Sequence, residues 1–255
     1  MPILDLAFHV LMFLLLGAIL GYIGGLLGIG GGLIAIPMLG VAFGYSEQAA
    51  QGTALVMVVP NVLVGLWHYV RKIGLDLRIA ATLAAAAVPF TYLAAHYATT
   101  LPSKPLRIAF GCFVLAIALW MAYRTLAAAR SAGRRTVLPW PFAAVVGAIG
   151  GTLSGLFSVG GAVFSVPVMS ALFGLSQVAA QGMGLALVAP GTLVSIATFG
   201  AAHDVNWITG AALAAGGVGA VPQGVTLAKR LPERVLRWLF TALMLASAIG
   251  LFLRS

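Results

Sequence analysis

The chain has 255 residues, of which 62% are hydrophobic and only 7% are charged. A soluble domain has about 25% charged residues, so this composition excludes a soluble enzyme and predicts an all-α polytopic integral membrane protein. The net charge of +9 comes without a dense basic cluster interleaved with aromatic residues, which argues against nucleic-acid binding.

The sequence repeats itself at an offset of 130 residues. Between residues 21–61 and 151–191, 16 of 41 positions are identical without a gap. The same register still aligns Leu101-Pro102 with Leu231-Pro232. We therefore predict two membrane repeats, residues 1–128 and 140–255, joined by a basic cytoplasmic linker over residues 129–139.

Each repeat divides into five apolar stretches, about 8–10 helical segments in all. In chain order they cover residues 5–27, 29–43, 48–70, 77–98 and 106–126, then 140–157, 159–173, 178–201, 206–228 and 236–253. Most have the ~20 residues that a helix needs to cross a membrane. The second stretch of each repeat is shorter and begins at a glycine-rich break, 28–32 or 158–162. Such a break exposes backbone amides that lipid cannot satisfy, so it must face protein or a watery cavity.

The basic residues indicate whether the chain crosses the membrane once at each broken pair of helices or returns to its starting side. If each broken pair crosses once, Lys and Arg divide 8 to 6 between the two sides. If each pair is a helical hairpin followed by three membrane-spanning helices, they divide 11 to 3, as the positive-inside rule expects. The hairpin places both termini on the non-cytoplasmic side and inverts the second repeat. Inverted repeats with broken helices are typical of secondary transporters.

The paired breaks are followed by Pro37-Met38 and Pro167-Val168, and then by Ala-x-Gly-type segments. Together these features resemble the sulfite exporter TauE/SafE family, also called the TSUP permeases, over essentially the whole chain. The second copy differs by having Ser158 and Ala162 where the first has Gly28 and Gly32. The resemblance implies a bacterial-type inner-membrane transporter of small sulfur or carboxylate anions, without fixing the substrate or the direction.

Five glycines at the starts of the short helices are candidates for binding the anion: Gly30, Gly31, Gly32, Gly160 and Gly161. Free amides and the positive end of a helix dipole attract anions, and glycine lets an oxyanion approach the backbone closely. The two helix N-termini could meet near the membrane midplane. Close packing of helices is the alternative role of these glycines.

Gln51 and Gln181 are the side-chain candidates for substrate binding. They occupy equivalent positions in the two repeats and donate through an amide without carrying a charge. The alternative is an interhelical hydrogen bond. The same argument for substrate binding applies to Asn61 in the first repeat only, because Gly191 replaces it in the second. Ser46 and Ser176 precede helical stretches and are predicted N-caps.

Titratable groups are scarce within the apolar stretches. The five acidic residues, Glu47 among them, fall near segment ends, where we expect them to be solvated. His68 is the candidate for proton coupling, and interfacial polarity is the alternative. Tyr69 and the nearby Trp67 fit an aromatic belt at the membrane surface.

No enzyme motif is present. The chain lacks a Walker A sequence, a dinucleotide fingerprint, metal-ligand spacing and a supported Ser-His-carboxylate set, so we expect no cofactor and no metal. The sequence favours a secondary transporter of a small anion that works by alternating access. The alternatives are a passive anion channel and a non-transporting accessory membrane subunit.

Overall fold

The computed structural model describes residues 3–128, 138–202 and 205–253, and regular structure within these ranges is entirely helical. The predicted linker therefore lies mostly outside the described residues. The first repeat forms α1 (Ile3–Leu27), α2 (Gly32–Phe43), α3 (Glu47–Ile73), α4 (Leu77–Thr100) and α5 (Ser103–Ala128). The second forms a 3-10 turn (Trp140–Phe142), α6 (Ala143–Phe157), α7 (Gly160–Leu172), α8 (Gln177–Ala201), α9 (Trp207–Arg230) and α10 (Glu233–Phe252).

Eight helical segments of the described chain are long and apolar enough to cross a membrane, which confirms the predicted multi-pass helical fold. The exceptions are α2, with 12 residues, and α7, with 13. At 1.5 Å per residue these helices are about 18–20 Å long, short of the ~30 Å hydrocarbon core.

The predicted caps are confirmed at the starts of α3 and α8. The hydroxyl of Ser46 accepts a hydrogen bond from the amide of Ala49, and that of Ser176 accepts one from Ala179. Each bond satisfies an amide that has no partner within its helix.

Both short helices turn back along the helix before them. The rings of Phe13 in α1 and Phe43 in α2 lie 4.9 Å apart between centroids, so α2 returns toward the start of α1. In the second repeat the amide of Leu138, before α6, donates to the carbonyl of Leu172 at the end of α7. Each break is therefore the tip of a helical hairpin.

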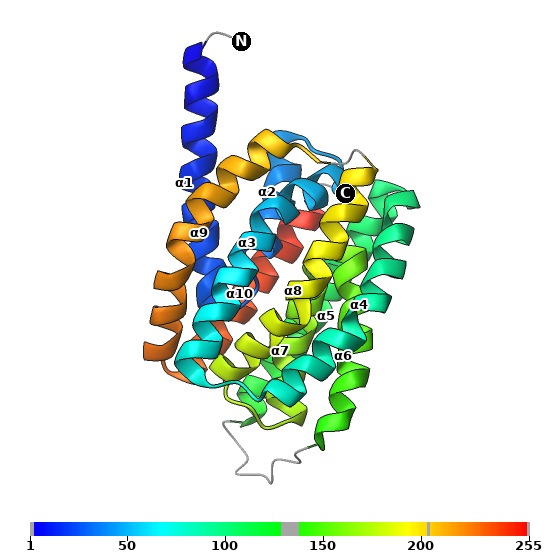
Figure 1. The fold of residues 1–255 in the computed structure, drawn as a ribbon, viewed down its shortest axis with the longest axis vertical. Helices are drawn as coiled ribbons and strands as arrows, with labels where there is room; N and C mark the ends of the chain where they lie inside the picture. The colour runs from blue at the N-terminus through cyan, green and yellow to red at the C-terminus, as the bar shows by residue number, and fades with distance from the viewer. Residues whose placement is uncertain (1–2, 129–137, 203–204, 254–255) are drawn as a thin grey trace.

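The two repeats interlock by exchanging partners, since α1 packs along α9 and α6 packs along α4 (Figure 1). Glycines allow this close approach. A Cβ added to Gly21 would lie 2.4 Å from the carbonyl oxygen of Gly217, and one added to Gly151 would lie 2.4 Å from that of Ala87. These two contacts occupy equivalent positions in the repeats, so small residues have a packing role along both helix pairs.

Two ends of the helical body can be distinguished. At the end where α3 stops and α4 begins, Lys72 Nζ donates to Thr226 and Lys229 Nζ donates to the carbonyl of Lys72. We call this the basic end, at the bottom of Figure 1. By helix direction it holds Arg71, Lys72, Arg78, Arg124, Lys229, Arg230, Arg234 and Arg237. At the opposite end Gln48 donates to the carbonyl of Leu101, and Lys104 and Arg107 lie nearby in sequence, at the start of α5.

Candidate functional site

The two glycine breaks touch each other inside the protein. A Cβ added to Gly32 would lie 2.2 Å from Cγ1 of Val159. The first break turns through the left-handed region, with φ of 68°, 69° and 90° at Gly28, Gly30 and Gly31. At the position equivalent to Gly28, Ser158 has φ of 61°. Both tips are buried, so the starts of α2 and α7 lie together away from solvent.

Backbone amides at these tips are left without acceptors. In the first break Ile29 donates to Gly24, and Ile34 and Ala35 donate to Gly31. No hydrogen bond within the described chain uses the amides of Gly30 and Gly31. The amides of Gly32, Gly160 and Gly161 belong to the first turns of α2 and α7, which have no intrahelical acceptor. Buried unpaired amides are costly, so this arrangement favours a bound acceptor.

Gln51 belongs to a chain of buried side chains on the second break. The hydroxyl of Ser158 donates to Oε1 of Gln51 at 3.2 Å, and Nε2 of Gln51 donates to Oε1 of Glu47 at 3.0 Å. Gln51 is 0% and Glu47 1% exposed. The expectation that Glu47 is solvated was therefore wrong, because packing around the start of α3 encloses its carboxylate.

Gln181 has the equivalent place on the first break. A Cβ added to Gly28 would lie 2.5 Å from Cβ of Gln181. The hydroxyl of Tyr69 lies 3.0 Å from Oε1 of Gln181 and 3.0 Å from the carbonyl oxygen of Gly25, so its one proton is shared between them. Tyr69 is 0% exposed, and its predicted place in an aromatic belt was wrong. Within the described residues Nε2 of Gln181 has no partner.

Each glutamine thus faces the break of the other repeat. Asn61 adds a further contact to the first break, since its Nδ2 donates to the carbonyl of Gly30 at 3.4 Å. The arrangement offers neutral donors, from amide nitrogens and glycine backbone, that suit the oxygens of a small anion. The sequence did not indicate that Glu47 and Tyr69 belong to this group. For Ser158 it did give a signal, because the offset of 130 residues aligns Ser158 with Gly28.

His68 lies apart from this group. It is half-buried, its Nδ1 is 2.9 Å from the carbonyl oxygen of Val64 on its own helix, and its ring packs edge-on against Trp67. Trp67 is exposed and carries the guanidinium of Arg71 over its ring at 4.1 Å. The structure therefore does not bring His68 to the breaks.

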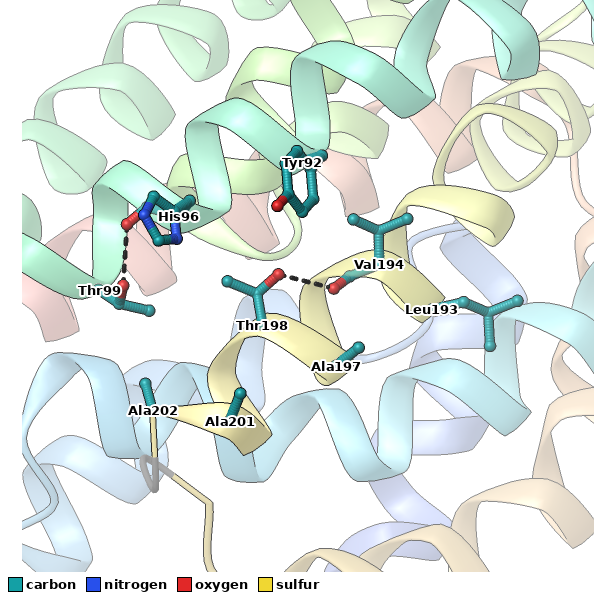
Figure 2. A pocket seen from close by; sticks show the side chains of 9 residues that line it. All are labelled: Tyr92, His96, Thr99, Leu193, Val194, Ala197, Thr198, Ala201 and Ala202. Carbon is teal, nitrogen blue, oxygen red and sulfur yellow. Dashed lines mark hydrogen bonds between the residues drawn. The ribbon is translucent and has the colours of Figure 1, made fainter.

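A groove of about 740 Å³ lies elsewhere, between α4 and α8. Figure 2 shows Tyr92, His96 and Thr99 on α4 facing Thr198 and neighbouring residues of α8 across it. Its remaining lining residues are Leu193, Val194, Ala197, Ala201 and Ala202. None of the predicted binding residues lines this groove, and Tyr92 and Leu193 are exposed, 57% and 49%.

The repeat explains the groove. Moving the lining residues at and just after the end of α8 back by 130 positions gives Trp67, Arg71 and Lys72 where the groove has Ala197, Ala201 and Ala202. In the first repeat, Lys72 Nζ donates a hydrogen bond to Thr226 on α9, and the guanidinium of Arg71 lies over the ring of Trp67. Large side chains thus occupy this place in the first repeat, whereas alanines in the second repeat leave the groove open.

Residues 13–251 match the family model described as Sulfite exporter TauE/SafE. The probable membrane transporter protein MJ0441 of Methanocaldococcus jannaschii is 28% identical over 195 residues, which cover 73% of this chain and 72% of that protein. The probable membrane transporter protein YunE of Bacillus subtilis is 22% identical over 223 residues, which cover 79% of this chain and 82% of that protein.

Proposed function

The chain belongs to the sulfite exporter TauE/SafE family, and on that premise we propose that it is a secondary transporter of a small anion. Both relatives described above are named as membrane transporters. The anion is a sulfur oxyanion, an organosulfonate or a small carboxylate, since these groups all present oxygens to amide donors. The chain carries no ATP-binding motif, which supports a gradient as the energy source.

The observation that carries this proposal is the meeting of the two breaks with the glutamine of the opposite repeat. Gly30, Gly31, Gly32, Gly160 and Gly161 would donate backbone N–H groups, and Gln51 and Gln181 would donate or orient through their amides. A site built from backbone and amide donors holds an anion through helix-end dipoles and hydrogen bonds. It avoids a fixed ion pair, which suits an anion that must be released in every cycle.

The burial of the two glutamines supports alternating access. Gln51 and Gln181 are 0% exposed, so an anion reaches them only when the packing around the breaks opens. We propose that the two hairpins move relative to α3 and α8 to open the site to one side at a time. Inverted repeats, as predicted from the sequence, provide two similar conformations for such a movement.

We propose that the protein lies in the inner membrane with its basic end on the cytoplasmic side, in line with the positive-inside rule. Both termini then face outward. A reporter that is active only outside the cytoplasm, fused after residue 255, should be active. Inactivity together with activity of a cytoplasmic reporter would reverse the orientation.

Exchange in liposomes tests the function. Purified protein is reconstituted with one unlabelled anion inside, and uptake of the same labelled anion is measured for sulfite, thiosulfate, sulfoacetate and acetate. A transporter gives saturable counterflow, limited to about 10³ turnovers per second or fewer. Flux far above that rate that needs no internal anion would indicate a channel, and an absence of flux for all four would indicate an accessory subunit.

Proton coupling through His68 stays a prediction, and the same liposomes test it. With a pH gradient imposed, the wild type and His68→Asn are compared. A gradient response that disappears in the variant supports His68, while an equal response in both excludes it.

A further inference from the structure

Gln177 is a buried amide without a partner. It is 0% exposed, and in the described part of the chain neither its Nε2 nor its Oε1 has a hydrogen-bond partner. Burying an amide without compensating bonds costs free energy, and such groups in native proteins call for an explanation. Packing alone gives none, because an apolar side chain would fill the same space without that cost.

The position of Gln177 connects it to the first break. It is the first residue of α8 and lies one turn before Gln181, so both side chains project from the same face of the helix. Gln181 contacts Gly28 and also has an unpartnered Nε2. Two buried amide nitrogens thus lead from the start of α8 toward the break. This start lies at the basic end, since a Cβ added to Gly182 would lie 2.9 Å from Leu75 in the loop between α3 and α4.

The equivalent position in the first repeat differs in charge and in bonding. Glu47 replaces Gln177 there, and its carboxylate accepts a hydrogen bond from Gln51. That pair lies at the opposite end of the body, where α3 begins. The amide nitrogen of Gln51 is therefore engaged, whereas those of Gln177 and Gln181 have no partner within the described residues. The two ends of the proposed route therefore differ in the side-chain donors that they leave for an anion.

We propose that Gln177 and Gln181 together form a subsite for the oxygens of a small oxyanion, on the basic-end side of the first break. This inference rests on the proposed function. It adds Gln177 to the binding residues and places the subsite toward the basic end. The anion bound there has its oxygens on the two amide nitrogens, beside the first break at Gly28. In the equivalent pair of the first repeat, the amide nitrogen of Gln51 already donates to Glu47.

The test compares three variants in the exchange assay, using whichever of the four labelled anions the wild type exchanges fastest. Gln177→Leu removes both unpartnered atoms at similar volume, so we expect an unchanged or higher melting temperature. Its half-saturation concentration should rise about tenfold or more. Gln177→Glu, which copies Glu47, should reduce exchange further. Gln223→Leu removes an exposed glutamine of α9 and should match the wild type.

The outcomes separate this inference from the function on which it rests. If the wild type exchanges none of the four anions, the proposed function fails and the subsite with it. If the wild type exchanges an anion and Gln177→Leu changes its half-saturation concentration less than twofold, the subsite alone is wrong. A Gln177→Leu variant that melts well below the wild type would also overturn it, because Gln177 would then have a structural partner.

Discussion

The hydroxyl of Ser158 donates a 3.2 Å hydrogen bond to Oε1 of Gln51, which ties the break of the second repeat to α3 of the first. Within the described residues Ser158 is the only non-glycine with a positive φ, 61°. Its equivalent, Gly28, has φ of 68° and lies against Gln181. The same backbone turn thus meets the same residue type in both repeats, with a side-chain bond in only one.

Replacing Ser158 by glycine should leave both stability and transport nearly unchanged. Glycine removes a left-handed strain of roughly 1–2 kcal/mol and loses a hydrogen bond that contributes about 0.5–1.5 kcal/mol. We expect the melting temperature, measured in detergent, to stay within about 4 °C of the wild type. Anion exchange should persist because glycine already occupies the equivalent position, Gly28, in the other repeat. A variant that folds but no longer exchanges would show that transport needs the hydroxyl, through its bond to Gln51 or by contact with the anion.

Gly30→Ala should abolish exchange, and Gly74→Ala supplies a matched control. Both glycines have φ of 69°, so alanine introduces similar backbone strain at each. At Gly74 an added Cβ meets nothing within 4 Å, whereas at Gly30 it would lie 2.6 Å from Val62. We expect Gly74→Ala to lower the melting temperature by a few degrees and to keep exchange. Equal exchange in the two variants would remove the first break from the binding site.

The helices and hairpins were predictable because they depend on local features: the length of apolar stretches, the glycine breaks and the capping serines. Contacts between repeats were not. Glu47 was expected in solvent because it begins a segment, yet tertiary packing encloses it at 1% exposure. Trp67 and Tyr69 are two residues apart on one helix, but Trp67 is 50% and Tyr69 0% exposed. Their neighbours on other helices, which the sequence does not display, decide this difference.

Tyr69→Phe should destabilise the protein and weaken anion binding. The change leaves the carbonyl of Gly25 and Oε1 of Gln181 buried without their shared donor, which costs about 1–3 kcal/mol. We expect a melting temperature several degrees lower and a higher half-saturation concentration for exchange, because Gln181 loses its anchor. Tyr97→Phe, at a position 60% exposed, is the control and should match the wild type. Equal melting of both variants would contradict the role of this hydroxyl.

Filling the groove between α4 and α8 should leave transport intact. Ala197→Trp places in the groove the residue type that Trp67 supplies at the equivalent position, and the volume of about 740 Å³ accommodates an indole. Because the proposed site lies at the breaks, where none of the groove residues is found, we expect the exchange rate to stay within about twofold of the wild type. Stability should be unchanged or higher, since the indole buries apolar surface. The measurement is initial exchange in liposomes alongside thermal unfolding. A folded variant whose exchange falls tenfold would make this groove part of the anion's route and would move the entry pathway from the hairpins to the surface of α8.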